Sequence, residues 1–385
     1  MVLNIELAGR LIMCNISGYI GDKRAAPILF EMMKNQEGYC AGYYTGITTL
    51  HEGKLFTAKV LGDVSCLLAQ TDAINFPGNV GIIHSRSNSG GDWRWSHPFV
   101  TADEKLSVCL NGAAGKYATA AKLAEAANYL SDLGVKFFTE SEYTDRIKGY
   151  PKLKNGNYVH TSEVIAQLAH HHLTKNPNMP SYLALEAAFL DVPKEAVVLS
   201  VCADEPGAIS YAKMNMPMAI ARTENEVFLS SFSICFPKDR EYVSLDELPQ
   251  ESSGKITLDA LEMHRFKSPK PMGRMTPSMM HDAYDIIIKT LEENGECGIG
   301  TLNQAVRVMW GDDVDLRYLA TYAVLQDLSD KGKIRTVKRM VSGPSEANDP
   351  NMKVPSFTLV LTDYANDNCQ NDKEIGEEER CDTTR

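Results

Sequence analysis

The chain has 385 residues, a length that suits two or three domains. Its apolar fraction of 44% and charged fraction of 23% are those of a soluble globular protein, and no apolar run approaches the ~20 residues of a membrane span. The net charge of −11 argues against nonspecific binding of the whole chain to nucleic acid or a membrane. Nine cysteines without a C-x-x-C pair indicate reduced thiols in a cytoplasmic protein, with neither a disulfide framework nor a metal site.

The first notable residue is a cysteine that directly follows a methionine. Residues 1–13 lack the pattern of a signal peptide, and Cys14 then opens a short apolar strand that ends at Gly18 and Tyr19. Two interpretations stay open at this point. Cys14 is either a buried strand cysteine or an N-terminal nucleophile, released if the chain starts at Met13 or loses its leader. A freed α-amine titrates near ~8 and could accept the thiol proton at neutral pH.

Most of the chain alternates between strand and helix patterns. We predict helices at 25–34, 64–73, 113–133, 162–173 and 183–190. We predict strands at 14–20, 43–50, 55–60, 79–86, 106–110, 197–202, 208–213, 218–221, 227–231, 241–244 and 255–257. Strands in hairpin-like succession with helices between them predict an α+β fold, in which stacked antiparallel sheets are flanked by helices.

The pattern changes after a proline-rich linker at 268–277. Three helical segments, at 278–293, from 300 and at 315–331, precede two strands at 333–340 and 356–361, which is the layout of a winged helix over 278–364. Acidic residues on the third helix oppose nucleic-acid binding, whereas basic residues beyond it favour such binding: Lys331, Lys333, Arg335, Lys338 and Arg339. Protein docking or dimerisation is the preferred interpretation, and residues 365–385 are predicted to form a disordered acidic tail.

Six short segments occur in a characteristic order. They are 14–19, 37–42, 83–86, 96–99, Asn111-Gly112 and 162–166. In order and spacing they resemble the class II glutamine amidotransferase domain, most closely the glutaminase half of glutamine–fructose-6-phosphate aminotransferase. The resemblance covers 14–267 and implies the four-layer αββα sandwich of the N-terminal-nucleophile hydrolases.

The resemblance also implies roles for individual residues. Cys14 would be the nucleophile, and its α-amine the base. The Asn111 side chain and the Gly112 backbone N–H would form the oxyanion hole. Arg86 would bind the α-carboxylate of the substrate, and His97 would lie near it. An alternative for His97 is a loop histidine that packs on its neighbours.

Several positions depart from the family pattern, among them Asn15, Ser87 and Leu110, and one departure concerns substrate recognition. Thr161 stands where the family has an acidic residue that holds the α-ammonium group of glutamine. A hydroxyl group can hydrogen-bond an ammonium group but cannot neutralise it, unless Asp92 or Glu163 takes over that role. The sequence also lacks the sugar-phosphate isomerase domains of the nearest relatives, and it contains no G-x-G-x-x-G or P-loop motif.

We therefore expect hydrolysis of the side-chain amide of glutamine or a related amino acid, without a cofactor. The ammonia would pass to a partner synthase or to solvent, and a homo-oligomer is compatible with this interpretation. The alternative is an inactive amidotransferase-like sensor that acts through the winged helix. For residues 1–13 three hypotheses remain: a misassigned start, a propeptide removed autocatalytically, or an uncleaved leader in an inactive protein.

Overall fold

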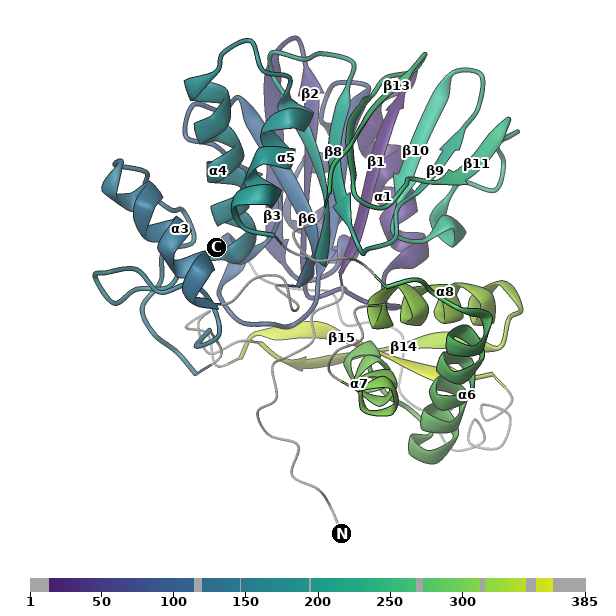
Figure 1. Cartoon of the computed structure of the whole chain (residues 1–385). Helices are drawn as coiled ribbons and strands as arrows, with labels where there is room; N and C mark the ends of the chain where they lie inside the picture. Colours follow the sequence, from purple (N-terminus) through teal and green to yellow (C-terminus); the bar gives the residue numbers. More distant parts are fainter. Residues whose placement is uncertain are drawn as a thin grey trace.

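The structure is a computed structural model that describes residues 14–113, 120–145, 147–193, 195–267, 273–311, 316–343 and 351–362 (Figure 1). The predicted leader, the predicted acidic tail and residues 268–272 of the predicted linker lie outside the described residues. Within the described residues, no helix is both long and apolar enough to cross a lipid bilayer.

Two antiparallel sheets make up residues 14–267, which we call the body. One sheet has the order β11-β9-β10-β1-β4-β2-β3, and the other has the order β13-β12-β8-β7-β6-β5. The strands of the first sheet are β1 (Asn15–Gly21), β2 (Tyr44–His51), β3 (Lys54–Leu61), β4 (Val80–Arg86), β9 (Ala219–Arg222), β10 (Glu226–Ser230) and β11 (Ser244–Glu247). Those of the second are β5 (Phe99–Val100), β6 (Leu106–Ala113), β7 (Glu195–Cys202), β8 (Ile209–Met214), β12 (Ser252–Ile256) and β13 (Leu261–Arg265).

Helices cover the sheets. Helix α1 (Ala25–Gln36) packs on β1 and β4, whereas α4 (Thr161–Lys175) and α5 (Ser181–Asp191) pack on the second sheet. Two further helices complete the body: α2 (Val64–Gln70) packs on β3 and β2, and α3 (Ala120–Asp132) lies outside α4 (Figure 1). Single 3-10 turns occur at Ala73–Asn75, Trp93–Trp95 and Ser233–Cys235. The predicted mixture of antiparallel sheets and helices is confirmed. The short strands β5 and β13 were not predicted, and β11 begins three residues after the start of the strand predicted at 241–244.

Side chains along β1 point alternately to the two faces of its sheet, and those on one face pack against the second sheet. Ile16 and Ile20 belong to the same buried cluster as Leu199 of β7, whereas Tyr19 belongs to the cluster beneath α1. At Gly18 an added Cβ would lie 3.0 Å from Ile209 Cδ1 of the opposite sheet, so the sheets approach closely there. Side chains at even positions of β1 therefore point between the sheets, which is also the side expected for Cys14.

Residues 273–362, which we call the C-terminal module, contain three helices and a hairpin. These are α6 (Pro277–Asn294), α7 (Ile299–Trp310), α8 (Arg317–Asp330), β14 (Ile334–Ser342) and β15 (Lys353–Leu361). Figure 1 shows the module against one end of the two sheets. Helix α6 starts one residue inside the predicted linker, and the order of elements agrees with the prediction.

The module is packed firmly on the body. One buried cluster contains side chains of both parts, including Ile16 of β1 and Leu325 of α8. The Tyr39 hydroxyl lies 2.6 Å from Ser329 Oγ of α8, and Lys338 of β14 forms an ion pair with the buried Asp63. These contacts hold α8 against the end of the sheets where Cys14 lies.

Candidate active site

Cys14 and Asn111 meet at the end of the space between the sheets. Cys14 directly precedes β1, and Asn111 lies near the end of β6 on the other sheet. The Cys14 backbone N–H donates a hydrogen bond of 3.1 Å to Asn111 Oδ1. The Asn111 amide nitrogen then donates to Ser231 Oγ at 3.2 Å and to the Tyr322 hydroxyl at 2.8 Å. The predicted nucleophile and the predicted oxyanion donor are therefore neighbours.

Gly112 follows Asn111 in a conformation that requires glycine. Its φ is +150°, and an added Cβ would lie 2.1 Å from the Glu195 carbonyl oxygen of β7. Any other residue would push the end of β6 away from β7. The glycine thus lets the strand end bend tightly beside Cys14, where a backbone N–H is expected to serve as an oxyanion donor.

Arg86 ends β4 in a closed aromatic environment. Its Nη1 donates to the Gly90 carbonyl oxygen at 3.0 Å, and its Nη2 donates to the Tyr150 hydroxyl at 2.6 Å. The guanidinium group also lies over the Tyr44 ring, 4.6 Å from the centroid. A guanidinium has five N–H donors, so these two bonds leave others for a carboxylate. The cage orients the arginine without neutralising its charge.

The Cys14 thiol lies close to this arginine but is held in its neutral form. Burial raises the pKa of Cys14 to about 11, although hydrogen bonding with Ser87 and the nearby Arg86 charge lower it. The thiol is therefore protonated at neutral pH in the described state. Without a base to remove this proton, Cys14 would be a poor nucleophile.

His97 belongs to a cluster of buried rings behind these residues. Its ring stacks on His84 with centroids 3.8 Å apart, and it also contacts Phe99 and His160. Burial and the neighbouring His84 hold the pKa of His97 well below its ordinary value, so the ring is neutral. Neither ring nitrogen has a hydrogen-bond partner among the described residues. His97 thus borders the site, and the structure leaves its predicted role open.

Thr161 is the first residue of α4, one residue before the predicted start of this helix, and His160 is the N-cap. The His160 Nδ1 accepts from the Ser162 backbone N–H at 3.1 Å. His160 also contacts Tyr150, which binds Arg86. Thr161 therefore starts a helix on the Arg86 side of the site.

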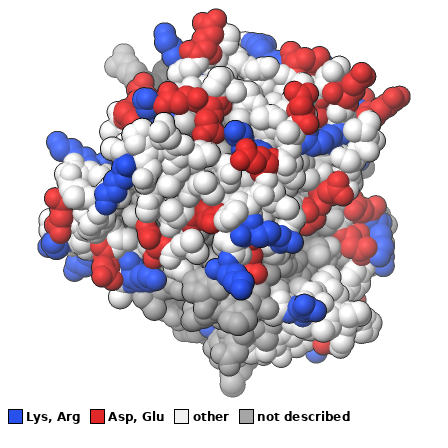
Figure 2. Space-filling model, turned by 45° about the horizontal axis from the view of Figure 1, so that its top comes forward, with Lys and Arg blue, Asp and Glu red and all other residues white. Residues whose placement is uncertain are grey.

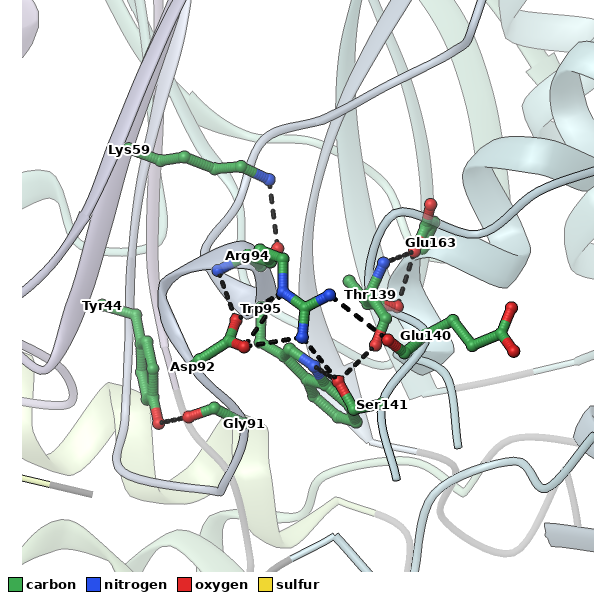
Figure 3. A network of polar contacts seen from close by, with 10 residues as sticks. All are labelled: Tyr44, Lys59, Gly91, Asp92, Arg94, Trp95, Thr139, Glu140, Ser141 and Glu163. Atoms are coloured by element: carbon green, nitrogen blue, oxygen red, sulfur yellow. Dashed lines mark hydrogen bonds and ion pairs between the residues drawn. The ribbon is translucent and has the colours of Figure 1, made fainter. Parts of the chain in front are cut away.

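The two carboxylates considered as substitutes for Thr161 are engaged elsewhere (Figure 3). Asp92 forms an ion pair of 2.7 Å with Arg94, whose side chain also donates to Ser141 Oγ. Glu163 accepts hydrogen bonds from the Thr139 backbone N–H at 2.9 Å and from the Thr139 hydroxyl at 2.6 Å. Asp92 thus holds the loop after β4 in place, and Glu163 holds the segment before α4, while the role of Thr161 stays a prediction.

Tyr322 of α8 also lies at this site, although its sequence context does not predict a functional role. Its hydroxyl donates to the Cys14 carbonyl oxygen at 2.6 Å and accepts from the Asn111 amide. In the sequence, Tyr322 is one of several apolar positions on the third helix of the module, and these positions predict only a core-facing stripe. A buried tyrosine usually needs a hydrogen-bond partner for its hydroxyl. A tyrosine within the apolar stripe was therefore the available sign of a polar contact.

A cavity of about 1020 Å³ lies next to the site, between the body and the module. The body contributes residues 38–43 and 87–89, and the module contributes α6, α7 and β15. Two of its wall residues, Cys40 and Ser87, interact with Cys14. Both parts of the chain thus enclose a space for a small molecule, and residues that interact with Cys14 separate this space from the thiol.

Sequence comparison finds curated relatives at 25–28% identity. No family model matches the chain. Glutamine–fructose-6-phosphate aminotransferases match from Pyrococcus horikoshii (26% identity over 223 residues, 57% of this chain and 32% of that protein) and Thermosynechococcus vestitus (26% over 269 residues, 68% and 38%). A third, from Helicobacter pylori, is 28% identical over 255 residues, 64% of this chain and 36% of that protein. The chain is a divergent relative of the class II glutamine amidotransferases.

The match spans about a third of the length of these relatives. Structure comparison agrees on the fold. The glutamine phosphoribosylpyrophosphate amidotransferase of B. subtilis, complexed with ADP and GMP, superposes with a TM-score of 0.53 at 15% identity, covering 73% of this chain and 58% of that one. A structure described as the allosteric regulatory enzyme of purine biosynthesis gives the same TM-score at 14% identity and the same coverage. The predicted resemblance is confirmed, while the roles of the individual residues stay predictions.

Proposed function

We propose that this chain hydrolyses the side-chain amide of glutamine or of a closely related amino acid, with Cys14 as the nucleophile. The observation that carries the proposal is the meeting of Cys14, Asn111 and Arg86 at the end of the space between the sheets. These residues are distant in sequence and supply a thiol, an oxyanion donor and a carboxylate-binding cation. The relationship to named glutamine amidotransferases supports the same reaction.

The reaction requires a freed α-amine on Cys14. That amine takes the thiol proton, and the thiolate attacks the amide carbon to form a C–S bond. The negative oxygen of the tetrahedral intermediate accepts hydrogen bonds from the Gly112 N–H and the Asn111 amide. The amine returns its proton to the departing nitrogen, the C–N bond breaks, and ammonia leaves. Water then attacks the thioester and releases glutamate and the thiol.

Substrate recognition would come from Arg86 and Thr161. Arg86 is buried and retains donors for a bidentate contact with the α-carboxylate. Thr161 would offer a neutral hydroxyl oxygen to the α-ammonium group, so binding of glutamine would be weaker than with a carboxylate at that position. His97 would bound the pocket as a neutral ring.

Several finer assignments are also part of this proposal. We assign residues 14–267 to the four-layer αββα sandwich of N-terminal-nucleophile hydrolases, and 278–364 to a winged-helix-like domain. The ammonia would go to a partner synthase or to solvent in the cytoplasm. No bound cofactor is needed for the steps above.

The module suits docking on the body better than nucleic-acid binding. The third helix of a winged helix would have to enter a groove, but α8 contacts the body through Tyr322 and Gln326. Seven of its residues are buried, either against the body or inside the module: Tyr318, Ala320, Thr321, Tyr322, Val324, Leu325 and Leu328. Of the basic residues beyond it, Lys331, Lys338 and Arg339 already pair with carboxylates. On the face drawn in Figure 2, acidic and basic side chains are interspersed.

The test is ammonia release from glutamine by the purified chain with Cys14 at its N-terminus. We expect turnover that Cys14→Ala abolishes. Cys66→Ala is the matched control because Cys66 lies on α2, away from the site, and should retain turnover. A chain that starts at Cys14 and yet binds glutamine without releasing ammonia would instead support the inactive sensor.

A further inference from the structure

Three hydrogen bonds form a closed circuit between the C-terminal module and the nucleophile. The Cys14 N–H donates to Asn111 Oδ1, the Asn111 amide donates to the Tyr322 hydroxyl, and that hydroxyl donates to the Cys14 carbonyl oxygen. The circuit fixes the orientation of the Asn111 amide in the uncleaved chain, since a peptide N–H can only donate, and a protonated α-amine on a freed Cys14 would orient it in the same way. Tyr322 therefore contacts both residues that the proposed reaction needs most.

In this state the Asn111 amide has no hydrogen left for a substrate. An amide nitrogen carries two hydrogens, and both have acceptors here: Ser231 Oγ at 3.2 Å and the Tyr322 hydroxyl at 2.8 Å. The Tyr322 oxygen receives the shorter bond and comes from outside the body. An oxyanion that used Asn111 would have to displace one of these two acceptors. The Tyr322 oxygen thus competes with the oxyanion of the proposed reaction for an N–H of the Asn111 amide.

The position of Tyr322 is enforced by the docking of α8. Its ring packs on Phe232 with centroids 4.7 Å apart, and Tyr39 contacts the same Phe232 while its hydroxyl meets Ser329. One helical turn after Tyr322, the Gln326 side chain accepts from the Ile234 backbone N–H at 3.3 Å. Cys14, whose carbonyl oxygen accepts from Tyr322, is only 3% exposed.

We propose that Tyr322 is a latch with which the C-terminal module keeps the amidotransferase site closed. Turnover then requires α8 to move far enough for the Tyr322 hydroxyl to leave Asn111 and Cys14. The proposal rests on the proposed function in so far as it concerns turnover. The closure of the Cys14 thiol by the module can be measured without any reaction of glutamine.

The first experiment compares wild type with Tyr322→Phe, which removes the acceptor oxygen and keeps the ring on Phe232. We expect kcat for ammonia release to rise severalfold, because one Asn111 hydrogen becomes free for the oxyanion. A kcat that is unchanged or lower in Tyr322→Phe overturns the latch, and a lower kcat would assign Tyr322 to holding Asn111 in place.

The second experiment measures alkylation of Cys14 by iodoacetamide, followed by mass spectrometry of the Cys14 peptide. Lys338→Ala removes the ion pair with Asp63 that anchors the module, without touching the site. A partly buried ion pair of this kind should change the opening equilibrium, and hence the alkylation rate, by about two- to fivefold. Arg339→Ala is the control, because Arg339 pairs with Glu296 inside the module and should leave the rate unchanged.

The two experiments separate the latch from the proposed function. Equal alkylation rates in wild type and Lys338→Ala would overturn the latch even if the wild type releases ammonia. Faster alkylation of Cys14 in Lys338→Ala, together with no ammonia release by wild type or Tyr322→Phe, would support the closure and contradict the proposed function.

Discussion

The backbone N–H of Cys14 donates to Oδ1 of Asn111 across 97 residues of sequence, and this bond joins the two sheets where a substrate would react. Because Oδ1 faces the Cys14 nitrogen, the amide nitrogen of Asn111 points away from it and can donate a hydrogen bond to another group. The same asparagine thus orients the nucleophile with one atom and is expected to stabilise the oxyanion with the other.

Asn111→Asp separates these two functions. The substitution retains an acceptor for Cys14 but replaces the amide donor with an anionic oxygen. We expect kcat for glutamine hydrolysis to fall by about 10²–10³ because one oxyanion donor is lost. Asn225→Asp, at an exposed turn, is the control and should leave kcat unchanged. A fall in kcat of less than threefold in Asn111→Asp would remove Asn111 from the oxyanion hole.

Thr161→Asp tests whether α4 begins at the ammonium-binding position. A carboxylate there would neutralise the α-ammonium group, so we expect KM for glutamine to fall about tenfold, the equivalent of ~1.4 kcal/mol. Thr161→Asn has a similar size without the charge and should leave KM near that of wild type. An equal KM in wild type and Thr161→Asp would show that Thr161 does not face the substrate.

The buried carboxyl group of Glu37 should make the free energy of unfolding depend on pH. Its carboxylate accepts from the Val64 backbone N–H at 3.0 Å and from Ser85 Oγ at 3.0 Å, yet burial, with nearby Asp63, raises its pKa from 4.5 to about 8. The folded state then binds more protons than the unfolded state between these values. The free energy of unfolding should therefore fall as pH rises from about 4.5 to about 8.

Glu37→Gln removes this titration while keeping an acceptor oxygen. We expect its melting temperature, relative to wild type, to rise steadily across that pH range and level off above it. Glu31→Gln, on the exposed face of α1, is the control and should follow the wild-type curve. Parallel curves for Glu37→Gln and wild type would mean that Glu37 is ionised throughout.

Gly42 shows how tightly the module meets the body. Its φ is +113°, and an added Cβ would lie 2.1 Å from the Phe357 ring of β15. Gly53 also has a positive φ, +71°, but its nearest neighbour would be 3.6 Å away. In urea unfolding we expect Gly53→Ala to cost ~1–2 kcal/mol from backbone strain alone, and Gly42→Ala to cost ~1–3 kcal/mol more through overpacking. Equal losses would show that β15 does not press on Gly42.

Local patterns in the sequence were enough to predict most helices and strands. Alternation along β1 and the helical period of α4 are local properties, and both elements lie within a few residues of the predicted bounds. The neighbours of β1 could not be predicted, because β10 pairs with it although 204 residues lie between the two strands, and these residues form strands of both sheets. β5 has two residues and β13 is exposed along its whole length, so neither carries a clear apolar pattern.

The candidate site was predictable only in part, and for a similar reason. Cys14, Arg86, Asn111 and Gly112 lie in motifs that resemble a known family, so their meeting was expected. Tyr322 lies 308 residues after Cys14, in a helix whose apolar stripe is typical of a core. Only the docking of the module on the body shows that this stripe meets the nucleophile.

The central claim is that Cys14 becomes an N-terminal nucleophile in a pocket that fits glutamine. The most direct measurement is the intact mass of the protein from its native host, before and after incubation with the glutamine analogue 6-diazo-5-oxo-norleucine. We predict a chain that starts at Cys14 and gains one adduct, and that the Cys14→Ala variant gains none. A chain that retains residues 1–13 and takes up no label would contradict the claim.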